Sequence, residues 1–129
     1  MIAENFKLLF DAHIENQVSF LYEAAVSGGI PIIKILENYY GKEKLKSISG
    51  IINGSSNYIL SKMESEGESF DTVLRNAQEI GFAESDISLD IDGFDTKYKL
   101  CILAAHGFGI ILAPYEVLSL GIRNISSDD

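Results

Sequence analysis

Cysteine, tryptophan, proline and histidine are all scarce in this sequence of 129 residues. It contains one cysteine, Cys101, no tryptophan, two prolines and two histidines. A single cysteine excludes a disulfide framework within the chain and a zinc site built from cysteines, and it fits a reducing compartment such as the cytoplasm. The two histidines, His13 and His106, lie in predicted helices, where a structural role is the more common one, and they give little support to a Ser–His–Asp or Cys–His triad.

Basic residues and long apolar runs are also scarce. Ten Lys and Arg stand against 19 Asp and Glu, which gives a net charge of −9. Because no run of basic residues offers a face to phosphates, nucleic acid and anionic membrane surfaces are not expected partners. No apolar stretch reaches the ~18 residues of a membrane span, and the N-terminus lacks the pattern of a signal peptide. The hydrophobic fraction of 47% predicts one folded domain with a sizeable core.

Apolar spacing along the chain predicts helices mixed with strands, and argues against a purely helical bundle. Helical spacing predicts helices at 2–16, 31–40, 57–66, 70–80 and 95–108. Short apolar stretches predict strands at 18–26 and 45–52, with a third possible strand at 117–122. Ser69 is a good N-cap, and Gly67 and Gly81 are typical helix ends.

The segment 82–93 interrupts the helical pattern and carries four acidic residues, so we expect a loop there. Asp95 begins the next helix, and Lys99 follows four residues later on the same helical face. An isolated pair at this spacing is usually a surface ion pair worth a few tenths of a kcal/mol, roughly. Beside a loop with carboxylates at Glu84 and Asp90, the pair has a second interpretation. Lys99 would be a proton donor oriented by its aspartate, next to carboxylates that bind a cationic group.

Two turns could bind a ligand through their backbone. Gly28 and Gly29 follow a predicted strand and could expose carbonyl oxygens, although such a pair usually makes only a turn. The turn 53–56 has amides that could bind an anion such as a substrate carboxylate. Neither turn contains GxGxxG, the dinucleotide fingerprint. The calcium-loop template also fails, since its twelfth position counted from Asp90 is Cys101 where a glutamate is required.

Three longer strings are more specific than these features. Residues 23–34 read EAAVSGGIPIIK, residues 50–60 read GIINGSSNYIL, and residues 81–103 read GFAESDISLDIDGFDTKYKLCIL. Together they closely resemble homoserine dehydrogenase, over most of the chain from about residue 2 to residue 125. The third string is the most specific, because an acid is followed by an Asp six residues on, an Asp eleven on and a Lys fifteen on. These four residues are Glu84, Asp90, Asp95 and Lys99.

The resemblance implies an oxidoreductase that interconverts L-homoserine and L-aspartate 4-semialdehyde with NAD or NADP, a step in threonine, methionine and isoleucine biosynthesis. The catalytic lysine of the family falls on Lys99, and a lysine ammonium can donate a proton at neutral pH. Asp95 would hold this ammonium and favour its charged form. Glu84 has the right sign to bind the α-ammonium of the substrate, and Asp90 adds to the same negative pocket. The remaining substrate contacts implied are Gly54, Ser55 and Phe82.

The resemblance also implies a monovalent-cation site around the glycine turn. Hard main-chain oxygens without a carboxylate cage suit Na⁺ better than Mg²⁺. The oxygens implied are those of Glu23, Val26, Gly28 and Ile30. Three positions depart from the family pattern without removing a catalytic group: Ser27 replaces a glycine, Phe82 a tyrosine that contacts substrate, and Ile87 a proline.

The fold implied by the resemblance is α+β, a mixed sheet with helices packed on one face. Residues 1–26 would be the last helix and strand of a Rossmann nucleotide-binding domain, and residues 27–129 a catalytic and dimerisation domain truncated at its C-terminus. We expect a homodimer whose partners are a small-molecule substrate and the rest of the Rossmann domain. Because the sequence has no glycine-rich phosphate turn, we expect the chain alone to lack activity and tight dinucleotide binding.

Two interpretations from other classes stay open. The chain could be a non-catalytic binding or dimerisation module that keeps the same scaffold. It could also be a free-standing metal-dependent enzyme that uses the carboxylates of the acidic loop.

Overall fold

The computed structural model describes residues 1–41 and 44–126, which form two compact units. The first unit comprises Met1–Ile52 and Lys97–Leu118, and the second comprises Asn53–Thr96 and the residues from Ser119 onward. Each unit has its own hydrophobic core. No helix within the described ranges is both long enough and apolar enough to cross a membrane.

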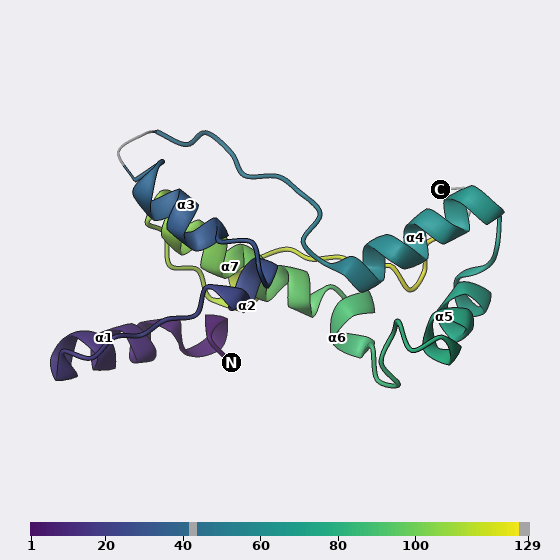
Figure 1. The fold of residues 1–129 in the computed structure, drawn as a ribbon, viewed down its shortest axis with the longest axis horizontal. Coiled ribbons are helices and arrows are strands. Elements are labelled where there is room, and N and C mark those ends of the chain that lie inside the picture. Colours follow the sequence, from purple (N-terminus) through teal and green to yellow (C-terminus); the bar gives the residue numbers. More distant parts are fainter. Residues whose placement is uncertain (42–43, 127–129) are drawn as a thin grey trace. The chain divides into compact units, whose positions relative to one another are not determined.

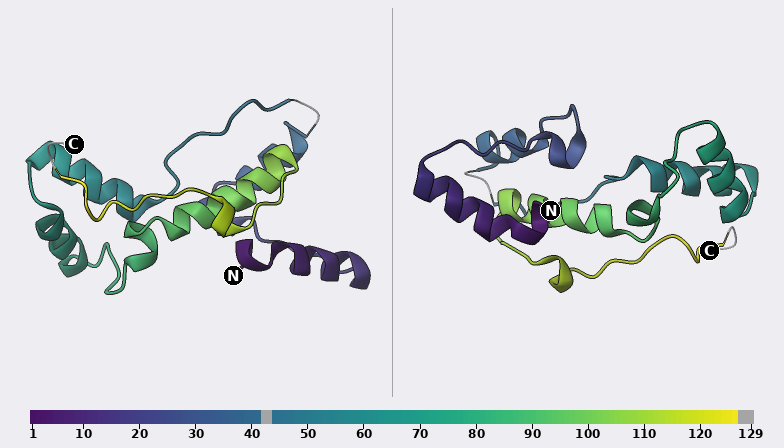
Figure 2. Two further views of the ribbon diagram at one scale, coloured as in Figure 1. Left: turned by 180° about the vertical axis from the view of Figure 1, so that it is seen from behind. Right: turned by 90° about the horizontal axis from the view of Figure 1, so that it is seen from below.

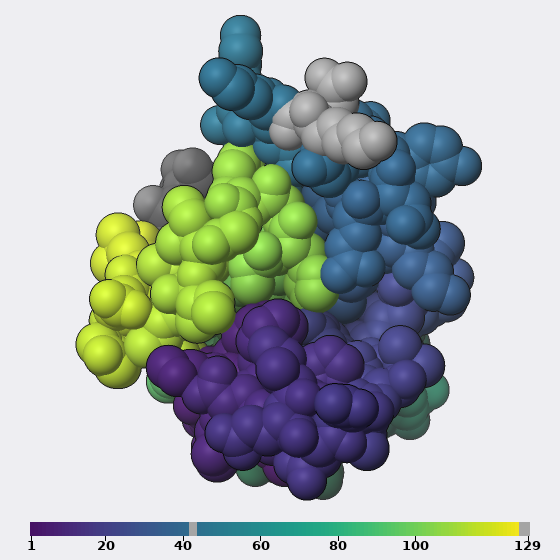
Figure 3. Space-filling model, turned by 90° about the vertical axis from the view of Figure 1, so that its left-hand side faces the viewer, coloured from purple at the N-terminus to yellow at the C-terminus, as the bar shows by residue number. Residues whose placement is uncertain are grey.

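The first unit is built from short helices around the longest helix of the described chain (Figure 1). Its elements are η1 (Ala3–Asn5), α1 (Phe6–Asn16), α2 (Ala24–Ser27), α3 (Ile32–Asn38), most of α7 (Phe94–Phe108) and η2 (Pro114–Glu116). The buried side chains of its core are Val26, Ile33, Leu36, Ile102 and Leu103. Purple side chains of the N-terminal helix lie beside green ones from the end of α7 on the face that Figure 3 shows.

The second unit contains α4 (Gly54–Glu66), α5 (Phe70–Glu79), α6 (Ser88–Ile91) and the first turn of α7. The helices α4 and α5 lie side by side in both views of Figure 2. The capping residues explain where these helices begin and end. Ser69 Oγ accepts from the Thr72 N–H at 3.4 Å, and Gly67 and Gly81 adopt positive φ angles of 67° and 71°. The five helices predicted from sequence are therefore confirmed to within a few residues at each end.

The predicted α+β fold is wrong, because the described residues contain helices and no strand. The segment predicted as a strand at 18–26 is irregular up to Tyr22 and then becomes α2. Glu23 explains the change of direction. Its two carboxylate oxygens accept the backbone N–H groups of Ile33 at 2.8 Å and Lys34 at 3.2 Å. This contact folds the chain back at Glu23, so the segment cannot continue as a straight strand.

The second predicted strand, 45–52, is also absent, as is the possible strand at 117–122. Leu45, Ile48 and Ile52 are the side chains of this segment that pack against the core of the first unit, at spacings of three and four residues. A strand presents alternate residues to one face and needs a hydrogen-bonded neighbour. The apolar residues instead follow the surface of a helix, since a Cβ at Gly107 of α7 would lie 2.7 Å from the Ile48 side chain.

Candidate functional site

Asn53 brings together two of the acidic residues that the sequence singled out. Its Nδ2 group donates to Asp90 Oδ1 at 2.7 Å and to Asp95 Oδ2 at 2.8 Å. The two carboxylates come from α6 and from the first turn of α7, and Asn53 lies between them with 8% of its surface exposed. Both N–H bonds of the amide are thereby directed at charged acceptors, which makes these stronger than neutral hydrogen bonds.

The local fold fixes Asn53 from its other side. Asn53 is the N-cap of α4, with extended backbone angles, and its Oδ1 accepts the Ser56 N–H at 2.8 Å. Ser56 Oγ donates to the main-chain oxygen of Asp90 at 3.1 Å, which ties α4 to α6. The oxygen and both N–H bonds of the Asn53 amide are therefore used, and we name Asn53, Asp90 and Asp95 the amide–carboxylate cluster. Sequence reasoning missed Asn53, because its amide partners lie 37 and 42 residues away.

The other predicted substrate contacts lie in the same unit. Gly54 and Ser55 occupy the first turn of α4, directly after Asn53, where backbone amides lack partners within the helix. Glu84 is exposed in the turn between α5 and α6, and Gln78 Nε2 donates to its main-chain oxygen at 3.1 Å. The Phe82 ring packs on the Tyr58 ring of α4 with 4.4 Å between centroids. The structure thus fixes the backbone at these positions, while their roles toward a substrate stay predictions.

Lys99 lies in the first unit and is half-buried. Its Nζ donates to the main-chain oxygen of Ile52 at 2.9 Å, and Ile52 directly precedes Asn53 in the sequence. Asp95 and Lys99 both belong to α7, four residues apart as predicted. A lysine held by a backbone carbonyl has a fixed ammonium position, which a proton donor requires.

The residues predicted for a monovalent-cation site surround α2. Val26 is buried, and Gly28 follows it with a φ of 57° that favours glycine. The Ile30 oxygen accepts the Ile32 N–H at 2.8 Å, and the Glu23 side chain is used at the start of α3. The cation site stays a prediction. No group of three or more His, Cys, Asp or Glu within residues 1–41 and 44–126 is arranged to hold a metal ion, so the acidic loop forms no such group.

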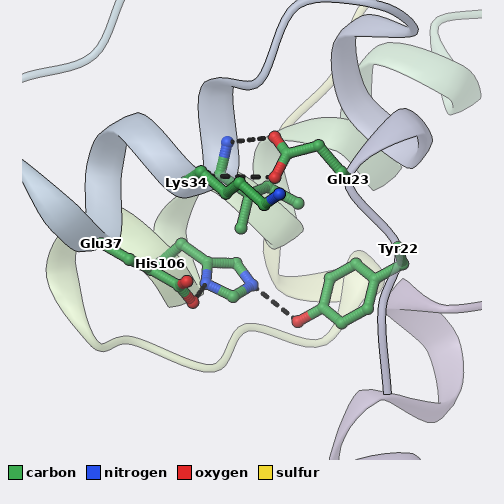
Figure 4. A network of polar contacts seen from close by, with 6 residues as sticks. Tyr22, Glu23, Lys34, Glu37 and His106 are labelled. Atoms are coloured by element: carbon green, nitrogen blue, oxygen red, sulfur yellow. Dashed lines mark hydrogen bonds and ion pairs between the residues drawn. The ribbon is translucent and has the colours of Figure 1, made fainter. Parts of the chain in front are cut away.

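A second polar network, in the first unit, was not predicted. Tyr22 Oη and His106 Nε2 are 2.6 Å apart, and His106 Nδ1 and Glu37 Oε1 are 2.8 Å apart (Figure 4). Burial raises the pKa of Tyr22 to about 12, so its hydroxyl stays protonated at neutral pH. The Glu37 carboxylate is an acceptor, so the hydrogen bond between Glu37 and His106 is donated by His106 Nδ1–H. This network borders a pocket of about 330 Å³ lined by aromatic rings, and it ties α3, α7 and the segment before α2 to one another.

Comparison with known proteins places the chain among dehydrogenases. The model of the homoserine dehydrogenase family matches residues 31–129, and the chain belongs to this family. The domain boundary predicted at residue 26 is not tested by this match, and residues 42–43 and 127–129 of the predicted catalytic domain lie outside the described residues.

Several relatives carry the same name. The homoserine dehydrogenase of Synechocystis is 49% identical over 121 residues, which is 94% of this chain and 28% of the relative. A crystal structure of a homoserine dehydrogenase from Thiobacillus denitrificans is 41% identical, with a TM-score of 0.96 over 99% of this chain and 30% of that one. A hyperthermophilic archaeal homoserine dehydrogenase in complex with NADPH is 34% identical, with a TM-score of 0.83 over 99% of this chain and 39% of the other. The chain thus spans about 28–39% of the length of these relatives.

Proposed function

We propose that this chain is the part of a homoserine dehydrogenase that binds the substrate and delivers the proton. The parent protein would interconvert L-aspartate 4-semialdehyde and L-homoserine with NADP or NAD. NADPH complexes among the structural neighbours support a nicotinamide cofactor. The observation that carries the proposal is the amide–carboxylate cluster, in which Asn53 holds Asp90 and Asp95 at 2.7 and 2.8 Å.

The chemistry divides between charge recognition and proton transfer. The substrate carries an α-ammonium, and a negative cluster beside the start of α4 can bind a cation on one side and a carboxylate on the backbone amides on the other. Reduction of the aldehyde places negative charge on its oxygen, which must gain a proton. We assign this proton to Lys99, since an ammonium anchored to a carbonyl is oriented for donation.

The nicotinamide, when bound, supplies the hydride. This sequence has no glycine-rich phosphate turn, so its residues do not fit the dinucleotide phosphates, and the cofactor would be held by other parts of the parent protein. We therefore propose that the chain alone does not catalyse the reaction. Dimerisation, occupation of the Na⁺ site and the cytoplasmic location also stay predictions from the sequence.

The test is steady-state kinetics of the parent protein with aspartate 4-semialdehyde and NADPH, followed by NADPH absorbance. Lys99→Ala should lower kcat and kcat/KM by similar factors, about 10²–10⁴-fold. Lys97→Ala is the matched control, since it removes the same charge two residues away on α7. Turnover of Lys99→Ala within about threefold of wild type would remove Lys99 from the mechanism. An inactive wild-type protein that folds would favour the non-catalytic module.

A further inference from the structure

The segment after Ser119 is strapped to the α6 turn by side-chain and backbone contacts. Arg123 Nε donates to Asp92 Oδ1 at 2.8 Å, and Arg123 Nη2 donates to Asp92 Oδ2 at 2.9 Å. This is a bidentate guanidinium–carboxylate contact, a geometry that makes an ion pair both stronger and more directional. The Ile122 N–H donates to the Ile91 oxygen at 2.8 Å one residue earlier on each side. We name residues 119–125 the strap.

Two glycines let the strap approach α6 closely. A Cβ at Gly121 would lie 2.6 Å from the Ile91 oxygen and 2.9 Å from the Asp92 Cα. A Cβ at Gly93, whose φ is 80°, would lie 2.9 Å from the Leu120 oxygen. Because both backbones lack a side chain where they meet, the contact cannot be kept with larger residues. The backbone of the strap therefore packs closely against the backbone of the α6 turn, and the Ile122 side chain packs against the core of the second unit.

The strap and the amide–carboxylate cluster hold neighbouring residues of one tight turn. Asp90 and Asp92 both belong to this turn, since the Asp90 oxygen accepts the Gly93 N–H at 3.1 Å. Asn53 and Ser56 hold Asp90 through its side chain and its main-chain oxygen. Arg123 holds Asp92 two residues later. Arg123 also holds the pKa of Asp92 below its ordinary value, so this carboxylate stays charged and paired.

We propose that Arg123 is a positioning residue, which acts through Asp92 to fix the place of Asp90 in the substrate site. The proposal rests on the function proposed above. The effect of Arg123 on the cluster is indirect, because its guanidinium binds Asp92 and not a residue of the cluster. Its effect is to stop the α6 turn from rotating, so that the Asp90 carboxylate keeps its direction toward the Asn53 amide and toward a cationic group on the substrate.

The experiment measures the kinetics of the full-length parent protein with Arg123→Ala, Arg123→Lys and Arg75→Ala. Arg75 is exposed on α5, and its replacement removes the same charge from the same unit, so it is the matched control. We expect Arg123→Ala to raise KM for aspartate 4-semialdehyde roughly three- to tenfold, the scale of one hydrogen-bonded contact. The value of kcat should change less, and KM for NADPH should not change. Arg123→Lys keeps the charge but not the bidentate contact, so its KM should lie between those of wild type and Arg123→Ala.

A double-mutant cycle separates this role from general stability. If Arg123 acts through Asp92, then Asp92→Asn, Arg123→Gln and the double variant should raise KM by the same factor. Equal KM for Arg123→Ala and Arg75→Ala overturns the inference, as do additive effects in the cycle. If Arg123→Ala does not fold, Arg123→Lys and the cycle decide. An inactive wild-type protein refutes the proposed function instead, so the two failures are distinguishable.

Discussion

Replacing Asn53 by aspartate tests the amide–carboxylate cluster most directly. The two side chains have nearly the same shape, and in Asn53→Asp the oxygen at the place of Oδ1 can still cap α4 through the Ser56 N–H. The atom at the place of Nδ2 would be a carboxylate oxygen 2.7 Å from Asp90 and 2.8 Å from Asp95. Two hydrogen bonds are lost and two contacts between like charges are gained.

The structure sets the scale of the effect. Hydrogen bonds to charged groups contribute about 1.5–3 kcal/mol each, and we take the lower value because both carboxylates are partly exposed. Repulsion at these distances ranges from about 1.5 kcal/mol per pair in water to about 6 kcal/mol at an effective dielectric constant of 20. Asn53→Ala loses the same hydrogen bonds and also the cap, worth about 0.5–2 kcal/mol, but adds no charge. The lost hydrogen bonds are common to both variants, so at neutral pH the aspartate variant should be less stable than the alanine variant by at least ~1 kcal/mol.

The pH dependence of the stability difference between the two variants tests whether Asn53 faces the two carboxylates. In the folded Asn53→Asp variant the two neighbouring carboxylates raise the pKa of the introduced carboxyl group, whereas in the unfolded chain this group ionises near pH 4, roughly. The penalty is therefore absent below about pH 4, grows as the pH rises toward the raised pKa and is constant above it. Urea unfolding of both variants of the parent protein at several pH values measures the gap. A gap that does not change with pH would show that Asn53 does not face the two carboxylates.

Two further predictions concern residues on either unit. Glu84→Ala removes a charge proposed to bind the substrate ammonium, so KM for aspartate 4-semialdehyde should rise more than kcat falls, with Glu84→Asp between; a fall in kcat alone would contradict the role. Tyr22 is held protonated by burial, with a pKa of about 12. Tyr22→Phe should therefore match wild type in tyrosinate absorbance below about pH 11 and lose signal above it, and a difference already present near pH 10 would contradict the buried network.

The helices could be predicted because their signals are local. Ser69 is the N-cap of α5, Gly81 follows its C-terminal end, and Gly67 is the C-cap of α4. Each of these signals can be recognised from three or four neighbouring residues. The predicted strands are wrong because strand formation is not a local property. A strand depends on pairing with a distant segment, and an apolar stretch such as 45–52 is equally able to lie across a helix. The packing of Ile48 against Gly107 is a contact that no local pattern contains.

The candidate site divides along the same line. Asp90 and Asp95 are visible as acids in a short stretch of sequence, and the spacing of Asp95 to Lys99 suggests one helical face. What makes the two acids a site is Asn53, whose amide is directed by its own role as the cap of α4. A capping asparagine needs only its Oδ1 for the cap, and here the Nδ2 group is buried between two charges. The residue that caps α4 is thus also the hydrogen-bond donor to both carboxylates, so a movement of α4 along its axis would break its contacts with Asp90 and Asp95.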